Sequence, residues 1–90
     1  MAQGVTYVTV QQFCAFHQCD HIVVEEFLDH GIFTVEYQGE ITVIPEPEVP
    51  RVEKALRLYR DLGVNAAGID IILRLLDRLD GERHSVVEDW

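Results

Sequence analysis

Residues that could bind a soft metal ion are concentrated near the start of the chain. Cys14, His17, Cys19 and His21 follow one another as C-x2-H-x-C-x-H, with His30 nearby. Zinc prefers thiolate and imidazole ligands, but structural zinc sites usually draw two ligand pairs from separated segments, whereas these four crowd one short turn. Cys14 also falls on an apolar stripe, where a free thiol packs as a small hydrophobe. We therefore expect no metal and no other cofactor, and zinc at Cys14, His17, Cys19 and His21 remains the alternative.

Catalytic chemistry has weaker support. The sequence contains no glycine-rich phosphate loop, and its Cys and His candidates have no defined third partner to complete a nucleophilic arrangement. His84 and Ser85 are adjacent in a polar C-terminal segment, which is not a triad. A chain of 90 residues also leaves little volume for a deep pocket. We expect a protein that is not an enzyme and has no catalytic residues.

The charge of the chain is distributed unevenly. The formal net charge is −9; residues 1–50 contain eight acidic residues and no Lys or Arg, whereas residues 51–90 contain all seven basic residues and another eight acidic ones. A negative field over one half of a small domain repels polyanions and attracts cations or basic protein surfaces. The alternative is a solvated acidic surface that serves solubility.

Length and hydropathy set the broad class. A chain of this length, about half apolar, has room for only one hydrophobic core, so we expect a single domain over residues 1–90. No segment combines a basic start, an apolar stretch and a small-residue cleavage site, and the apolar runs are short. We therefore expect no membrane partner, a cytoplasmic location and free thiols at Cys14 and Cys19.

The elements that position these residues begin with a helix-turn-helix over residues 5–31. Thr6 to Thr9 forms a short β-leaning lead-in, and Thr9 followed by Gln12 matches the capping box that opens a helix. Asp20 is placed to cap a second helix, and Gly31 supplies a left-handed stop. The pattern predicts two short helices joined by a tight turn.

A wing and a connector follow. The segment "IFTVEYQGEITVI", residues 32–44, alternates β-branched and aromatic residues with polar ones around Gln38-Gly39, which predicts a β-hairpin. The next segment, "PEPEVP", contains three prolines in six residues and predicts a stiff extended connector. Pro50 suits the first turn of a third helix.

A helical hairpin is predicted over residues 50–80. The third helix, from Pro50 to Leu62, ends at Gly63 as its C-cap, and Asn65 is the N-cap of the fourth helix, which Gly81 ends before a tail of residues 81–90. Gly68 predicts a close backbone approach by a neighbouring element. The two helices are expected to pack antiparallel through Leu56, Tyr59, Ile69, Leu73 and Leu76, and the buried stripe of the fourth also includes Ile72 and Leu79.

Together these segments resemble a known superfamily. The early Phe13-Cys14 and a late "RDLGVN-x-x-GI-x-x-x-L-x-LL" pattern, running from Arg60, fall at the spacings of the CbpM chaperone-modulator branch of the MerR superfamily. The similarity covers about Val5 to Leu79, and Gly63, Asn65 and Gly68 belong to it as structural motif residues. The fold it implies is mainly α: a MerR-like winged helix-turn-helix with a small β-hairpin wing, followed by an antiparallel two-helix hairpin.

The resemblance also implies a function and partners. CbpM-like proteins bind the J-domain of a DnaJ-like co-chaperone, CbpA, and restrain it, so this chain is expected to do the same. J-domains carry a basic second helix, which an acidic surface would complement. The partner-binding residues we expect are Glu25, Glu26 and Asp29 on the second helix and Glu36 and Glu40 on the wing. A homodimer is a further possible partner.

The alternative within the same superfamily is a DNA-binding transcriptional regulator. MerR-type activators place a basic residue and two aromatics shortly before the glycine that closes the second helix; here, set against Gly31, those places hold Glu25, Glu26 and Phe27. Affinity for duplex DNA comes largely from Lys and Arg that neutralise phosphates. The expected helix-turn-helix and wing carry no Lys or Arg, so we do not expect a nucleic-acid partner. Their acidic residues are Asp20, Glu25, Glu26, Asp29, Glu36 and Glu40.

Overall fold

The computed structural model describes the backbone of residues 6–89 and the side chains of residues 6–81. The predicted mainly helical fold with a small wing is confirmed. Its elements in chain order are β1 (Tyr7–Thr9), α1 (Val10–His17), α2 (His21–Asp29), β2 (Glu36–Gln38), β3 (Ile41–Pro45), the short 3-10 helix η1 (Glu46–Glu48), α3 (Val49–Leu62) and α4 (Ala66–Asp89).

The helix-turn-helix forms because each end of its helices has a local cap. The Thr9 hydroxyl accepts a hydrogen bond from the Gln12 amide at 2.9 Å and the Gln12 side chain accepts one from the Thr9 amide at 3.0 Å, so the predicted capping box is confirmed. The Asp20 carboxylate accepts from the amide two residues later at 3.2 Å. Gln18 and Gly31 adopt left-handed backbone conformations that end α1 and α2.

The predicted hairpin is confirmed, and it belongs to a three-stranded antiparallel sheet of order β1-β3-β2. In the hairpin, Gln38 lies opposite Ile41, and Gly39 takes a φ of +66° in the turn between them. On the other side of β3, Tyr7 pairs with Pro45. The sequence predicts the lead-in strand but not its partner, because strand pairing depends on contacts between distant segments.

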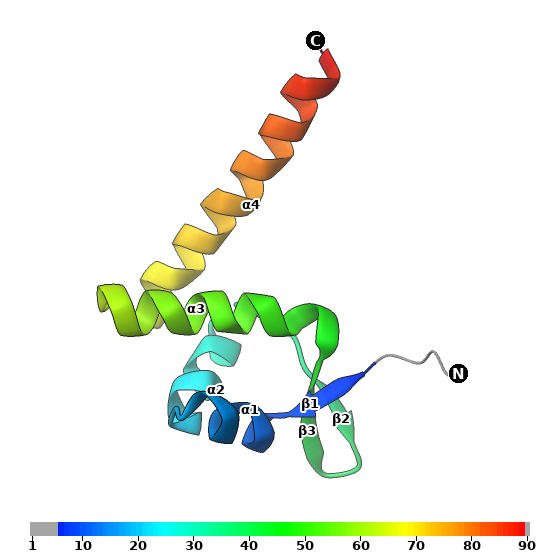
Figure 1. The fold of residues 1–90 in the computed structure, drawn as a ribbon, viewed down its shortest axis with the longest axis vertical. Coiled ribbons are helices and arrows are strands. Elements are labelled where there is room, and N and C mark those ends of the chain that lie inside the picture. Colours follow the sequence, from blue (N-terminus) through cyan, green and yellow to red (C-terminus); the bar gives the residue numbers. More distant parts are fainter. Residues whose placement is uncertain (1–5, 90) are drawn as a thin grey trace.

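The hydrophobic core lies between the helix-turn-helix, α3 and the first turns of α4. Figure 1 shows α1 and α2 on one side of α3, with α4 starting near the C-terminal end of α3. The wing covers one end of this core through β3. The buried residues of the cluster are Phe13, Cys14, Val24, Phe27, Ile32, Phe33, Ile44, Val52, Ala55, Leu56, Ala66, Ile69 and Leu73.

The prediction of an extended connector at residues 45–50 is wrong. Glu46–Glu48 form the 3-10 helix η1, and α3 begins directly after it, at Val49. Proline is compatible with the first turn of a helix, where its missing N–H has no partner to lose. The Glu48 side chain adds a tertiary contact, since it accepts a hydrogen bond from the Thr34 amide at 3.1 Å.

The predicted break between the third and fourth helices is confirmed. Gly63 adopts a φ of +67°, which a residue with a Cβ atom rarely takes, and its amide donates to the Tyr59 carbonyl at 3.1 Å. The Asn65 side chain then accepts from the Gly68 amide at 2.9 Å, which is N-cap geometry. The caps at Gly63 and Asn65 turn what could have been one rod into two helices.

The prediction that Gly81 ends the fourth helix is wrong. Helix α4 continues through it to Asp89, so the described part of the predicted tail is helical, and Trp90 lies outside the described residues. A single glycine costs a helix only about 1 kcal/mol and stops it only when the local backbone also turns. The projecting α4 gives the molecule extents of 47 × 40 × 20 Å (Figure 1). Within residues 6–89, none of the helices has the length and apolar character that a membrane span requires.

The predicted contact between the third and fourth helices is confirmed only near the break. Leu56, Ile69 and Leu73 are buried in the core, whereas Tyr59 and Leu76 are exposed. The cause is the direction of α4, which diverges from α3 after its first turns (Figure 1). Of the other residues in the predicted stripe, Ile72 is half-buried and Leu79 is exposed.

The close approach at Gly68 differs from the prediction. A Cβ atom there would lie 2.7 Å from Cγ1 of Val64 and 3.4 Å from the side-chain oxygen of Asn65. The tight neighbour is therefore the loop between the two helices, not the backbone of α3. Val64 packs against the core, so it has little freedom to move away.

Replacing Gly68 by Leu is expected to lower the free energy of unfolding by about 1–3 kcal/mol, because the added side chain overpacks against Val64. Thermal and urea unfolding would measure the change. Gly81→Leu is the matched control: a Cβ atom there meets no other atom within 4 Å, and the leucine should stabilise α4 slightly. Equal stability of the Gly68→Leu variant and the wild type would contradict this account of the loop.

Candidate protein-binding surface

Helix α2 separates an apolar face from an acidic one. Val24 and Phe27 point into the core and are buried, while Glu25, Glu26 and Asp29 are exposed on the other side. This arrangement follows from the helical repeat, which places the two kinds of residue on different faces. The exposed side of the second helix of the helix-turn-helix is therefore negatively charged.

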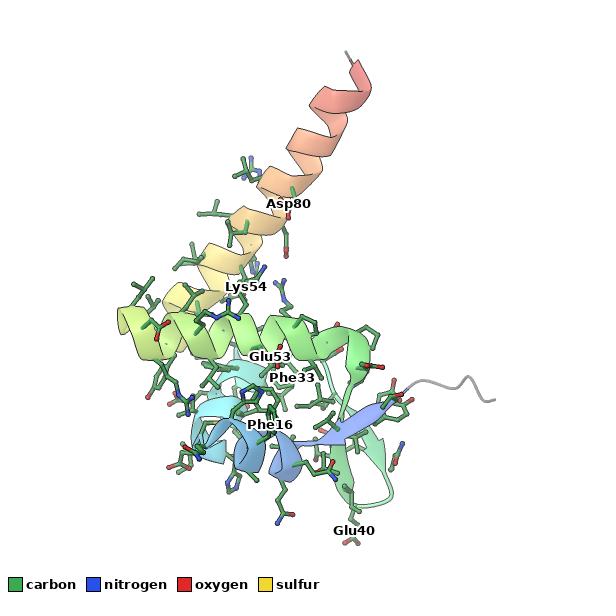
Figure 2. All side chains as sticks on the ribbon, viewed as in Figure 1. Phe16, Phe33, Glu40, Glu53, Lys54 and Asp80 are labelled. Carbon is green, nitrogen blue, oxygen red and sulfur yellow. The ribbon has the colours of Figure 1, made fainter. Side chains whose placement is uncertain are left out.

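The wing contributes two further carboxylates, Glu40 in the turn of the hairpin and Glu36 on β2. Glu40 lies at the tip of the hairpin, on the other side of α3 from Asp80 of α4 (Figure 2). Glu36 is on β2, where it accepts a hydrogen bond from the Tyr7 hydroxyl at 3.0 Å. This hydrogen bond, to a carboxylate, raises the pKa of Tyr7 above its usual value.

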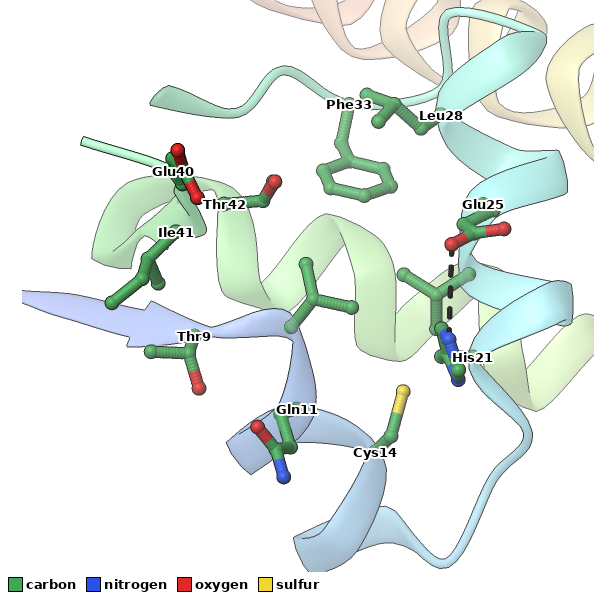
Figure 3. A pocket seen from close by; sticks show the side chains of 12 residues that line it. Thr9, Gln11, Cys14, His21, Glu25, Leu28, Phe33, Glu40, Ile41 and Thr42 are labelled. Atoms are coloured by element: carbon green, nitrogen blue, oxygen red, sulfur yellow. Dashed lines mark ion pairs between the residues drawn. The ribbon is translucent and has the colours of Figure 1, made fainter. Parts of the chain in front are cut away.

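A groove of about 760 Å³ lies between α1, α2 and the wing. In Figure 3, the ring of Phe33 is between the wing residues and α2, and the ion pair of His21 with Glu25, at 3.8 Å, lies along one side. Of the five predicted partner-binding residues, the groove brings Glu25 and Glu40 together. Its lining residues are Thr9, Val10, Gln11, Cys14, His21, Val24, Glu25, Leu28, Phe33, Glu40, Ile41 and Thr42.

The other three predicted residues lie outside this groove. Glu26 and Asp29 are exposed on α2, and Glu36 is exposed on β2. The apolar residues of the groove, Leu28, Phe33 and Ile41 among them, are not predicted from the sequence. These residues belong to segments that come together only in the folded protein. The hydrophobic periodicity within each segment therefore does not indicate the groove.

The Cys and His residues near the start of the chain have separate surroundings. His17 pairs with Glu53 of α3 at 3.2 Å, and a ring nitrogen of His30 lies 3.0 Å from the Glu26 carbonyl oxygen. Cys14 and Cys19 are free thiols. Among the described residues, no group of three or more His, Cys, Asp or Glu side chains is arranged to hold a metal ion.

The thiol of Cys14 is held in its protonated form. Burial in the core disfavours the thiolate and, together with a hydrogen bond to the Cys19 thiol, raises the pKa of Cys14 to about 12. The group is therefore neutral at physiological pH and packs as a small apolar side chain. Its position in the wall of the groove adds to the apolar character of that wall.

Arg60 fixes the turn of the helix-turn-helix. Its Nη2 donates hydrogen bonds to the carbonyl oxygens of His17 and Gln18, at 2.7 and 2.6 Å. These are carbonyls at the end of α1 that lack a partner within the helix, and a cation there also interacts favourably with the helix dipole. The sequence places Arg60 at the start of the late pattern that carries the family resemblance but does not show which distant carbonyls it reaches.

Arg51 links three parts of the fold. Its Nε donates to the Ile32 carbonyl at 2.6 Å, and its guanidinium pairs with Asp77 of α4 at 3.0 Å. Arg74 pairs with Asp70 along α4 at 3.0 Å. Several basic residues of the second half of the chain are thus engaged in interactions within the protein, while the helix-turn-helix and wing have no Lys or Arg.

The order of elements, with a helix-turn-helix, a β-hairpin and two further helices, defines a small winged helix-turn-helix domain. The family described as MerR HTH family regulatory protein matches residues 8–88, so the chain belongs to this family. The comparison with curated proteins finds no match. The predicted MerR superfamily is confirmed, and membership of its chaperone-modulator branch stays a prediction.

Proposed function

We propose that this protein is a chaperone modulator that binds the J-domain of a DnaJ/CbpA-like co-chaperone and restrains its action on DnaK. The observation that carries the proposal is the charge of the helix-turn-helix and wing. Residues 1–50 have no Lys or Arg, and Glu25, Glu26 and Asp29 are exposed on α2. Such a protein acts by binding in the cytoplasm and needs no catalytic group or cofactor.

Charge complementarity supports this partner. J-domains as a class, as the family resemblance implies, carry a basic second helix beside the loop that engages DnaK. An acidic surface attracts such a helix during diffusional encounter and holds it in register. Glu25 and Asp29 stand at i,i+4 on α2, where like charges cost a few tenths of a kcal/mol. A basic partner would relieve this repulsion.

The alternative is a MerR-type DNA-binding transcriptional regulator, with which the family description is also compatible. It requires contacts between cations and phosphates, because counterion release supplies most of the affinity of proteins for duplex DNA. The exposed face of α2 offers carboxylates at Glu25, Glu26 and Asp29 instead. These groups would repel the phosphates of a DNA groove, so we favour the protein partner.

A pull-down from cell lysate with a parallel gel-shift on genomic fragments separates the two functions. The proposal expects mass spectrometry to identify a J-domain co-chaperone in the captured material, with no shift of the DNA. Addition of excess purified J-domain to the lysate should displace the captured co-chaperone. Recovery of DNA without a co-chaperone would favour the DNA-binding regulator over the chaperone modulator.

We further propose that helix α4 associates with another copy of this chain. Its apolar side chains continue past the core as an exposed stripe on one face, formed by Ile71, Leu75, Leu76 and Leu79. Apolar residues recurring at helical spacing without cover are typical of helix–helix association.

Replacing Leu75 and Leu79 by Ser should shift the protein from dimer to monomer in sedimentation equilibrium, because these are two of the four apolar side chains of the stripe. Arg74→Ser with Arg78→Ser is the control on the same helix. A wild-type protein that stays monomeric at high concentration would contradict the dimer without affecting the J-domain proposal.

A further inference from the structure

The groove between α2 and the wing specifies the shape of a binding partner more closely than the acidic face alone does. We infer that it receives an apolar side chain of a basic amphipathic α-helix, whose Lys or Arg residues pair with Glu25 and Glu40. The inference deepens the proposed function and rests on it for the source of the helix, the J-domain.

The shape and lining of the groove suit an apolar anchor. Its volume of about 760 Å³ lies within the range of roughly 300–1,000 Å³ typical of ligand sites. Phe33, Val24 and Leu28 form an apolar wall, and Ile41 lies on the wing side with 57% of its surface exposed. An exposed isoleucine beside an apolar wall gains by burial against a partner side chain.

The rim of the groove selects for positive charge. Glu25 lies on α2 and Glu40 at the tip of the wing, so carboxylates stand on two different elements around the apolar wall (Figure 3). No Lys or Arg is among the lining residues. Within the groove, Glu25 lies 3.8 Å from the His21 side chain. A partner that places an apolar residue in the groove needs cations on both sides of it.

The neighbouring backbone favours a helix over an added strand. The wing residues in the groove, Ile41 and Thr42, belong to β3, the central strand of the sheet. β3 is paired with β2 from Ile41 to Val43 and with β1 from Val43 to Pro45, so only Ile41 and Thr42 have an edge without a partner on the β1 side. Two residues are too few to pair with an added strand of the usual length, roughly 3–10 residues. A helix needs no backbone partner, and it presents an apolar residue flanked by cations at i±3 and i±4.

A pair of exposed apolar residues provides the test. The variants Ile41→Ser, in the groove, and Leu62→Ser, at the end of α3 and outside both the groove and the acidic face of α2, replace side chains that are 57% and 69% exposed. Fluorescence anisotropy with the full chain and a labelled J-domain of a CbpA-like co-chaperone would measure the dissociation constant. We expect Ile41→Ser to weaken binding about tenfold and Leu62→Ser to change it less than about twofold.

A second set of variants tests the role of the carboxylates in the same assay. Glu25→Gln combined with Glu40→Gln should weaken binding several-fold, whereas Glu46→Gln, at an exposed position on η1 outside the groove, should have little effect. Circular dichroism and thermal unfolding of every variant would confirm that the fold is retained.

Failure of the inference and failure of the proposed function give different results. Wild-type affinity of the Ile41→Ser variant for the J-domain would overturn the inference and leave the proposed function standing. If the J-domain does not bind at all, the proposed function fails. The groove is then tested with two synthetic helical peptides, one composed of Leu and Lys and the other of Leu and Glu. Binding of the Lys peptide alone, weakened by Ile41→Ser, would support the inference; equal or absent binding of the two would overturn it.

Discussion

Replacing Glu25, Glu26 and Asp29 together by Lys is expected to weaken J-domain binding by about 100-fold at low salt while leaving the fold intact. All three side chains are exposed on α2, so their replacement removes no core contact. Each reversal turns an attraction to the basic partner helix into a repulsion worth on the order of 1 kcal/mol at a partly solvated contact. Anisotropy titration of both proteins against the same labelled J-domain measures the effect.

Salt dependence and a matched variant show whether the effect is local. For the wild type, association should slow and weaken as salt rises from about 0.05 to 0.5 M, because the facing charges become screened. Reversal of Glu46, Asp61 and Asp80 to Lys changes the net charge equally at exposed positions elsewhere. It should reduce affinity far less. A folded α2 triple variant with wild-type affinity and salt dependence would move the site elsewhere, for instance to α3 and α4.

Replacing Arg60 by Ala is expected to lower the free energy of unfolding by about 1.5–2.5 kcal/mol. The substitution leaves the carbonyls of His17 and Gln18 without the donor that now lies 2.7 and 2.6 Å away. The loss falls at the turn that sets the angle between α1 and α2. Binding of the partner should therefore weaken as well, although Arg60 is on α3.

Two controls separate the hydrogen bonds of Arg60 from its charge. Arg57→Ala removes an exposed cation from the same helix and should cost less than about 0.5 kcal/mol. Arg60→Lys keeps the charge but not the planar geometry of the guanidinium, so it should recover part of the stability. Equal unfolding free energies for Arg60→Ala and Arg57→Ala would contradict the role assigned to Arg60.

The features that the sequence predicts well are those set by neighbouring residues. The capping box at Thr9, the stop at Gly31 and the break at Gly63 and Asn65 each depend on a few adjacent groups, and all are confirmed. Residues 45–50 show the limit of this reasoning. Their prolines are compatible with the extended form as well as with a helical first turn, and tertiary contacts such as that of Glu48 with Thr34 accompany the helical outcome.

The direction and extent of α4 could not be predicted in the same way. Leu73 and Leu76 have the same chemistry and helical spacing, yet one is buried and the other exposed, because burial depends on where α3 and α4 diverge. Gly81 signals a helix end only when the chain turns there, which local sequence does not decide. The acidic residues of the candidate site follow directly from the sequence, whereas the groove between α2 and the wing depends on how the two segments pack together.

One measurement tests most directly whether this winged helix-turn-helix binds a protein rather than DNA. The purified chain would be titrated, in one buffer at physiological salt, against a labelled J-domain of a CbpA-like co-chaperone and against labelled duplex DNA from the genome. The account predicts saturable binding of the J-domain and no binding of the duplex, since Glu25, Glu26 and Asp29 give the exposed face of α2 a negative charge. Saturable binding of the duplex with none of the J-domain would contradict it.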